Sequence, residues 1–187
     1  MITRCVLPVA LLLCFSITAL SRSFNLLQFQ QRISNEECEK LLWTLKGTPE
    51  SCLEDQMNFE VPEEIEQPEQ LQREDAAWVI CVMLQKISHI FTQNVSRTGW
   101  DETTIEDLLA ELSQQVHHLQ AVLPGDVKER NATGGKDRAI QRLDEYYSKI
   151  GQYLKAKDYS PCAWTVVHGE ILRNFLFIRI LTDYLQN

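Results

Sequence analysis

The chain has 187 residues, enough for one domain with a sizeable core, and 26 acidic residues against 18 basic ones give a formal net charge of −8. An acidic surface of this kind argues against nucleic acid or an anionic lipid surface as the main partner. Six cysteines without any CxxC or cysteine–histidine spacing argue against a zinc site, and we expect neither a metal nor another cofactor.

The first 21 residues have the pattern of a secretory signal peptide. Arg4 supplies a positive start, residues 5–15 form an apolar run of 11, and small residues end at Ser21 with the spacing of a cleavage site. That run is too short to span a bilayer, and no later stretch reaches the ~18 apolar residues that a membrane helix needs. The sequence therefore predicts a secreted, soluble product without membrane insertion, in which 22–187 form a single helical domain.

Apolar residues recur with helical spacing along the chain, and no strand-like alternation competes with them. Thr103 and Glu106 have the spacing of a capping box, and Ser160 followed by Pro161 is a typical helix start. The predicted helices are 24–45 (with Leu26, Phe29, Ile33, Leu41 and Leu45 near one stripe), about 68–94, about 101–123, about 137–157 and 160–185.

The connections between these five helices differ in length. The first, about 46–67, and the third, about 124–136, are long and polar, whereas the other two are short. Long connections are uncommon in compact domains and allow the helices that they join to run parallel. The fold that we predict is an all-α, up-up-down-down helical cytokine bundle of five helices.

Four cysteines remain after signal removal: Cys38, Cys52, Cys81 and Cys162. They allow three pairings. A bridge between Cys52 and Cys162 would tie the long first connection to the start of the last helix and stabilise the fold by up to ~4.7 kcal/mol. The alternative is that both are free buried thiols.

The last helix carries apolar residues on both sides. Its core side holds Trp164, Val167, Ile171, Phe175, Ile178 and Leu185, and its opposite side holds His168, Gly169, Leu172, Arg173 and Leu176. Exposed leucines around an arginine are typical of a protein-binding hot spot. The alternative is that the first connection covers these leucines within the monomer.

No group of residues suggests catalysis. Neighbouring histidines such as His117 and His118 diverge on a helix, and no serine or cysteine has a nucleophile motif around it. We therefore predict no catalytic residue and no enzyme. A carrier of small apolar ligands, with a cavity between helices, is the alternative function. Asn94 and Asn131 begin glycosylation sequons between periodic segments.

Several stretches resemble the type I interferon family, and within it the beta group. They are LLWTLKGTPESCLEDQMNF, MNFEVPEEI, TGWDET, YLKAKDYSPCAW and CAWTVVHGEILRNF, and the resemblance extends from the signal peptide to the terminal LTDYLQN. It implies a secreted, glycosylated helical cytokine of innate immunity. Such a ligand would be a monomer that gathers two different receptor subunits and triggers JAK-STAT signalling with antiviral, antiproliferative and immunomodulatory effects.

The resemblance also implies which residues bind. The family's bridge falls on Cys52 and Cys162, and its second receptor subunit meets the face formed by the second to fourth helices, where His89 and Ser113 are the candidates. Its high-affinity subunit meets the first connection and the last helix. The residues implied there are Trp43, Leu53, Gln56, His168, Gly169, Leu172, Arg173 and Leu176.

The chain departs from the family at informative positions. Gln56 replaces a usual arginine, and His168 replaces another, which predicts mildly pH-dependent binding. The usual sequon at WNET reads WDET, which leaves Asn94 and Asn131 for any sugar. Cys81 is additional, so it could pair with Cys38, although a free Cys38 is the simpler expectation.

Overall fold

The computed structural model of the chain describes residues 3–45, 52–123 and 134–185, with side chains throughout except at 3–23, Leu53 and 134–136. Every regular element in these ranges is helical, as the sequence predicted. The elements are α1 (Thr3–Thr44), η2 (Leu53–Asp55), α2 (Glu63–Glu66), η3 (Pro68–Gln70), α3 (Arg73–Phe91), η4 (Val95–Thr98), α4 (Glu102–Val122), α5 (Gly134–Ala156) and α6 (Pro161–Tyr184). The five long helices correspond to the five predicted ones, and the short α2 adds a sixth within the first connection.

Two helix starts show how local chemistry sets the boundaries. Ser160 caps α6 as predicted, because its hydroxyl accepts a hydrogen bond from the backbone N–H of Ala163 at 3.2 Å. The capping box predicted at Thr103 is wrong, because Asp101 caps α4 instead. Its carboxylate accepts from the backbone N–H of Thr104 at 2.8 Å and also favours the positive end of the helix.

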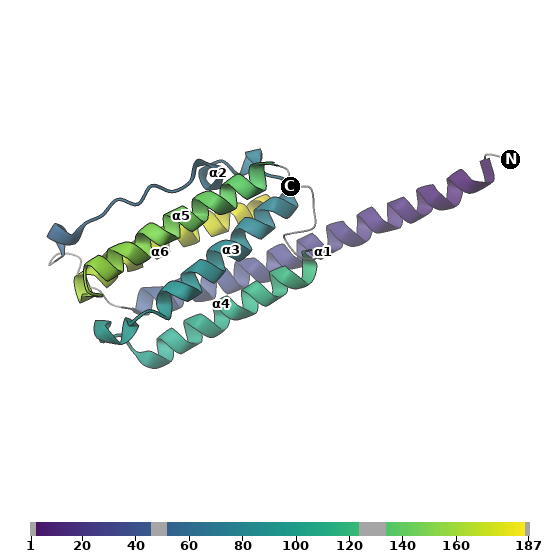
Figure 1. Cartoon of the computed structure of the whole chain (residues 1–187). Helices are drawn as coiled ribbons and strands as arrows, with labels where there is room; N and C mark the ends of the chain where they lie inside the picture. The colour runs from purple at the N-terminus through teal and green to yellow at the C-terminus, as the bar shows by residue number, and fades with distance from the viewer. Residues whose placement is uncertain (1–2, 46–51, 124–133, 186–187) are drawn as a thin grey trace.

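Four helices form an up-up-down-down bundle. α1 and α3 run in one direction, α4 and α6 run in the other, and α5 is an additional helix packed on α3 and α6 (Figure 1). α4 and α5 run in opposite directions although a long connection joins them, and they pack on different sides of α3. The long third connection therefore joins two antiparallel helices rather than a parallel pair.

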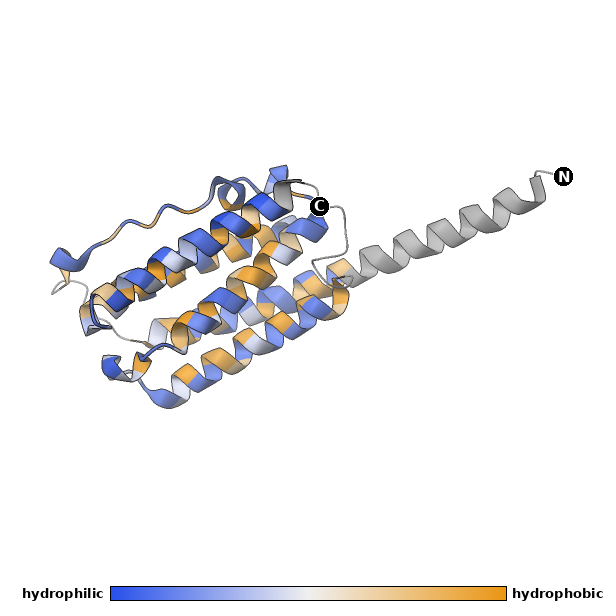
Figure 2. Ribbon diagram, in the orientation of Figure 1, coloured by the Kyte–Doolittle hydropathy of each residue, from blue (hydrophilic) through white to orange (hydrophobic). Residues whose placement is uncertain are grey.

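The core lies between the inward sides of the five long helices, where apolar residues gather (Figure 2). All six residues predicted for the core side of α6 are buried. The stripe predicted for α1 is wrong in part, because Leu26, Phe29 and Ile33 are 58%, 61% and 54% exposed. The buried residues of α1 are Phe24, Leu27, Gln28, Gln31, Ser34, Asn35, Cys38 and Leu42, and the buried Leu45 follows directly after the helix.

Buried polar residues explain that difference. Gln31 donates to the side-chain oxygen of Gln115 on α4, and Asn35 donates to the hydroxyl of Thr182 on α6 at 3.2 Å. A buried polar group is costly without such a partner. Both partners lie far away in the sequence. The pattern of apolar residues within α1 therefore does not identify this side of the helix as buried.

The N-terminal part of α1 projects from the bundle (Figure 1). It contains the segment predicted to be a cleaved signal peptide. Within the described ranges, no helix combines the length and the apolar character that crossing a membrane requires.

Candidate functional site

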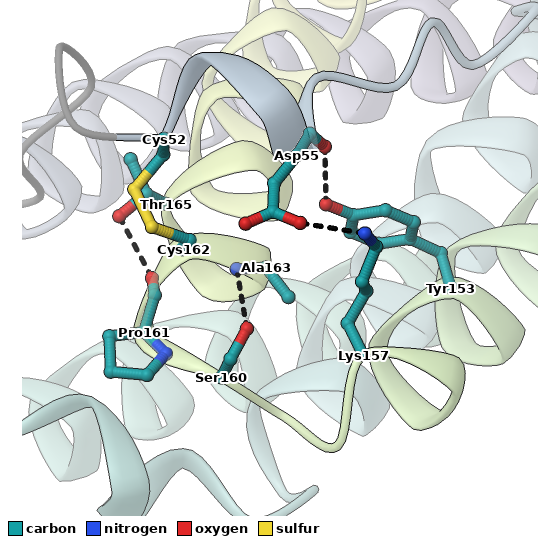
Figure 3. Close-up of a disulfide and its surroundings, with 9 residues drawn as sticks. All are labelled: Cys52, Asp55, Tyr153, Lys157, Ser160, Pro161, Cys162, Ala163 and Thr165. Atoms are coloured by element: carbon teal, nitrogen blue, oxygen red, sulfur yellow. Dashed lines mark hydrogen bonds and ion pairs between the residues drawn. A yellow bond between two sulfur atoms is a disulfide. The ribbon is translucent and has the colours of Figure 1, made fainter.

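A disulfide joins the first connection to the start of α6. Cys52 and Cys162 are bonded across 110 residues of sequence, which is the pairing expected from their positions (Figure 3). Next to the bridge, the carbonyl of Asp55 accepts from the hydroxyl of Tyr153 at 2.6 Å, and its carboxylate pairs with Lys157 at 2.7 Å. The first described residues of the connection are therefore held by the end of α5 as well as by α6.

Further contacts hold the rest of this connection along the bundle. The buried ring of Phe59 packs edge-on against Tyr153 with 5.6 Å between ring centroids, and the Phe59 carbonyl accepts from the Arg173 guanidinium. At the far end, the hydroxyl of Tyr184 donates to the carbonyl of Leu71 at 2.7 Å. The described part of the connection thus lies fixed against α5 and α6.

The outward side of α6 remains open beside that connection. Gly169 is exposed and Leu176 is 46% exposed, whereas Leu172 and Arg173 are half-buried. The connection therefore does not cover the predicted strip completely. Ile180 lies one turn beyond Leu176 and is also exposed. Its i+4 spacing from Leu176 could have placed it in the strip from the sequence.

The end of α1 borders this strip. Trp43 is 71% exposed, and the carbonyl of the preceding Leu42 accepts from Nε2 of His168 at 2.8 Å. The His168 ring also packs near Trp100, with 5.6 Å between centroids. Burial lowers the pKa of His168 below 6.5, although the bond to Leu42 opposes this shift. His168 therefore joins α1 and α6, and its lowered pKa favours the uncharged ring at neutral pH.

The remaining residues predicted for this side come from the connection. Gln56 is exposed, and the side chain of Leu53 lies outside the described residues. Met57, which was not among the predicted residues, is 49% exposed next to Gln56. Nothing in the spacing of a non-helical segment distinguishes an exposed methionine from a buried one.

A second candidate face lies on α3 and α5. A groove of about 310 Å³ lies where α3 and α5 pack together, and His89 lines it together with Ile90, Tyr147, Gly151 and Lys155. Across the groove, Lys86 and Asp144 form an ion pair at 2.6 Å. Ser113 is exposed on α4 and does not line the groove, so the structure does not bring the two predicted residues together there. Because Lys86, Asp144 and Lys155 line it, this groove does not resemble the apolar cavity of a carrier.

Cys38 and Cys81 are both buried and free, so they do not form a second bridge. Burial raises the pKa of the Cys81 thiol to about 11, and burial followed by the charge of Glu111 raises that of Cys38 further. Thiols of this kind are unreactive near neutral pH. Among the described residues, no group of three or more His, Cys, Asp or Glu side chains could hold a metal ion.

The structure describes only one of the two glycosylation sequons. Asn94 is exposed in a left-handed conformation (φ 47°) between α3 and η4. Asn131 lies outside the described residues.

Comparison with known proteins places the chain in a family. A family model for the interferon alpha/beta domain matches residues 27–185. Interferon beta of Homo sapiens is 55% identical over the full length of both chains, and that of Mus musculus is 41% identical over 98% of each. Among solved structures, Zebrafish interferon 1 has a TM-score of 0.67 over 82% of this chain and 95% of its own. At 19% identity that likeness shows the fold alone.

Proposed function

The chain belongs to the type I interferon family, and on this premise we propose that it is a secreted, interferon beta-like cytokine that assembles a receptor from two different subunits. Assembly would activate JAK-STAT signalling and with it antiviral, antiproliferative and immunomodulatory responses. The family is one of cytokines, not of enzymes.

We assign the high-affinity subunit to the side formed by the first connection, the end of α1 and the outward strip of α6. The observation that carries this assignment is the open strip around Gly169 and Leu176, which lies beside a connection fixed by a disulfide. A fixed, partly apolar surface binds well because little conformational entropy is lost on association. The residues assigned are Trp43, Leu53, Gln56, His168, Gly169, Leu172, Arg173 and Leu176.

We assign the second subunit to the side formed by α3, α4 and α5, with His89 and Ser113 as candidate contacts. Because α3 packs on the inward side of α6, the outward strip of α6 and the outer side of α3 point in different directions. Two subunits could therefore bind one ligand without competing for the same surface.

The deciding experiment measures binding of the monomeric ligand to each immobilised ectodomain of the type I interferon receptor, separately and then in sequence. We expect a 1:1 complex with each ectodomain, followed by a ternary complex when the second is added. Mutual exclusion of the two ectodomains would contradict the assignment of two separate sides.

Processing follows from the same proposal. We expect removal of residues 1–21, so N-terminal sequencing of the secreted product should begin at Arg22. Any N-linked sugar should be at Asn94 or Asn131, and glycosidase treatment of Asn94→Gln and Asn131→Gln variants would identify which one carries it.

A further inference from the structure

Glu170 is a buried carboxylate on the side of α6 that faces α5. It is only 9% exposed, and its Oε1 accepts hydrogen bonds from the hydroxyl of Tyr146 and, at 2.7 Å, from Nη2 of Arg173. A buried carboxylate without such donors would be strongly destabilising. The hydrogen-bond donors to Glu170 therefore indicate which part of the molecule its carboxylate holds in place.

On one side, hydrogen bonds from α5 fix this carboxylate. Tyr147 donates to Oδ1 of Asn174, and Nδ2 of Asn174 donates to the hydroxyl of Tyr146, which donates in turn to Glu170. Burial first, and then the bond to Glu170, raises the pKa of Tyr146 well above 10, so the phenol stays protonated and remains a donor.

On the other side, Glu170 orients Arg173. Burial alone would lower the pKa of the Arg173 guanidinium, but the hydrogen bond to Glu170, the charge of Glu170 and the contribution of Tyr146 together outweigh burial, and the pKa is raised. The same Nη2 that pairs with Glu170 also donates to the backbone carbonyl of Phe59. Arg173 therefore connects the carboxylate to the first connection.

Phe59 is one of two anchors of a short exposed segment. The other is Asp55, which is held by Tyr153 and Lys157. The three residues between them, Gln56, Met57 and Asn58, are all exposed. A chain fixed at both ends over so few residues has little freedom to move. We call 56–58 the arch.

We propose that Glu170 is a positioning residue of the high-affinity receptor site: through Arg173 it fixes the Phe59 end of the arch, so that Gln56 and Met57 meet the receptor subunit in one preformed arrangement. This inference rests on the proposed function. Arg173 then has two roles, direct contact with the receptor subunit and the holding of the arch, and Glu170 shares only the second.

The main test is Glu170→Gln, which preserves size and removes the charge. Loss of a charge-assisted hydrogen bond should weaken binding to the high-affinity ectodomain about fivefold. It should also speed hydrogen exchange at residues 56–59, while binding to the second ectodomain stays unchanged. Glu39→Gln is the matched control, because Glu39 pairs with Arg179 between α1 and α6 at 3.9 Å without contacting the arch. It should leave hydrogen exchange at 56–59 and binding of the high-affinity ectodomain unchanged.

Two further variants separate positioning from general destabilisation. Tyr146→Phe removes one hydroxyl. It should weaken binding to the high-affinity ectodomain and speed hydrogen exchange at 56–59, each by less than Glu170→Gln does. This variant keeps the inference testable if Glu170→Gln fails to fold. Met57→Ser should cost less affinity in a Glu170→Gln background than in wild type, because the arch is then already loosened.

This inference would be overturned if folded Glu170→Gln and Tyr146→Phe variants kept the wild-type affinity or the wild-type hydrogen exchange at 56–59. If the wild-type chain still bound tightly in that experiment, the proposed function would stand. A wild-type chain that binds neither ectodomain would overturn the proposed function and this inference with it.

Discussion

The side of the bundle with the first connection and α6 is built differently from the side with α3 and α5. The first has a disulfide, several hydrogen bonds to backbone carbonyls, and exposed apolar side chains at Trp43, Met57 and Leu176. The second has a groove crossed by the ion pair of Lys86 and Asp144. Within the described ranges, no exposed large apolar side chain lies on α3, α4 or α5.

That difference suggests how one ligand could bind two subunits with unequal affinity. Apolar side chains on a fixed surface provide most of the free energy of a tight interface. Charged groups around a solvated groove contribute less affinity, and what they contribute depends on salt. The expected order is tight binding on the α6 side and weaker, salt-sensitive binding on the α3–α5 side.

The largest effect should come from removing the disulfide. Cys52→Ser combined with Cys162→Ser should lower the free energy of unfolding by about 4 kcal/mol, because the bridge closes a long loop. Urea denaturation measures this change. Binding to the second ectodomain should survive below the unfolding transition, so a loss there equal to the loss on the α6 side would contradict the separation of the two sides.

Arg173→Ala should have the second-largest effect. We expect a loss of ~2 kcal/mol or more in binding to the high-affinity ectodomain, since the substitution removes both a half-buried guanidinium and the bond to Phe59. Surface plasmon resonance measures it. An unchanged dissociation constant in a folded variant would remove Arg173 from the site.

Leu176→Ser tests the apolar strip directly. Binding to the high-affinity ectodomain should weaken by ~1 kcal/mol, while the stability of this exposed position changes by less than ~0.5 kcal/mol. Leu26→Ser is the matched control, since Leu26 is more exposed but lies on α1, outside the assigned residues. Equal effects of the two substitutions would show that exposed apolar area alone, and not its place, decides binding.

Salt should distinguish the two sides. Raising ionic strength from about 0.05 to 0.5 M should weaken binding to the second ectodomain more than binding to the first, because the Debye length falls well below ~10 Å. Lys86→Gln should reduce this dependence, with an effect on affinity of ~0.5 kcal/mol. Equal salt slopes for both ectodomains would contradict the electrostatic contrast.

The smallest effect concerns pH. Because the pKa of His168 is lowered in the folded state, the unfolded state binds more protons just below pH 6.5. The contribution of His168 to the free energy of unfolding should therefore be fully present above about pH 6.5. It should decrease as the pH falls toward the pKa of His168 in the folded state. Thermal unfolding of His168→Gln between pH 5 and 7.5 should show a shallower dependence than wild type. An identical slope would assign the pH dependence to other groups.

Local patterns in the sequence were enough to predict much of the fold. The five long helices, the core side of α6 and the Ser160 cap follow from periodicity and capping chemistry, which act between residues a few positions apart. The bridge between Cys52 and Cys162 also agreed with their predicted positions.

Only the assembled bundle decided which side of α1 is buried and how the arch is held. Gln31 and Asn35 are inside because partners 84 and 147 residues away satisfy their amides. Arg173 holds a carbonyl 114 residues earlier, and its orientation depends on Glu170 and two tyrosines of α5. Such pairings have no local period, so the amino-acid sequence specifies them only through packing in three dimensions.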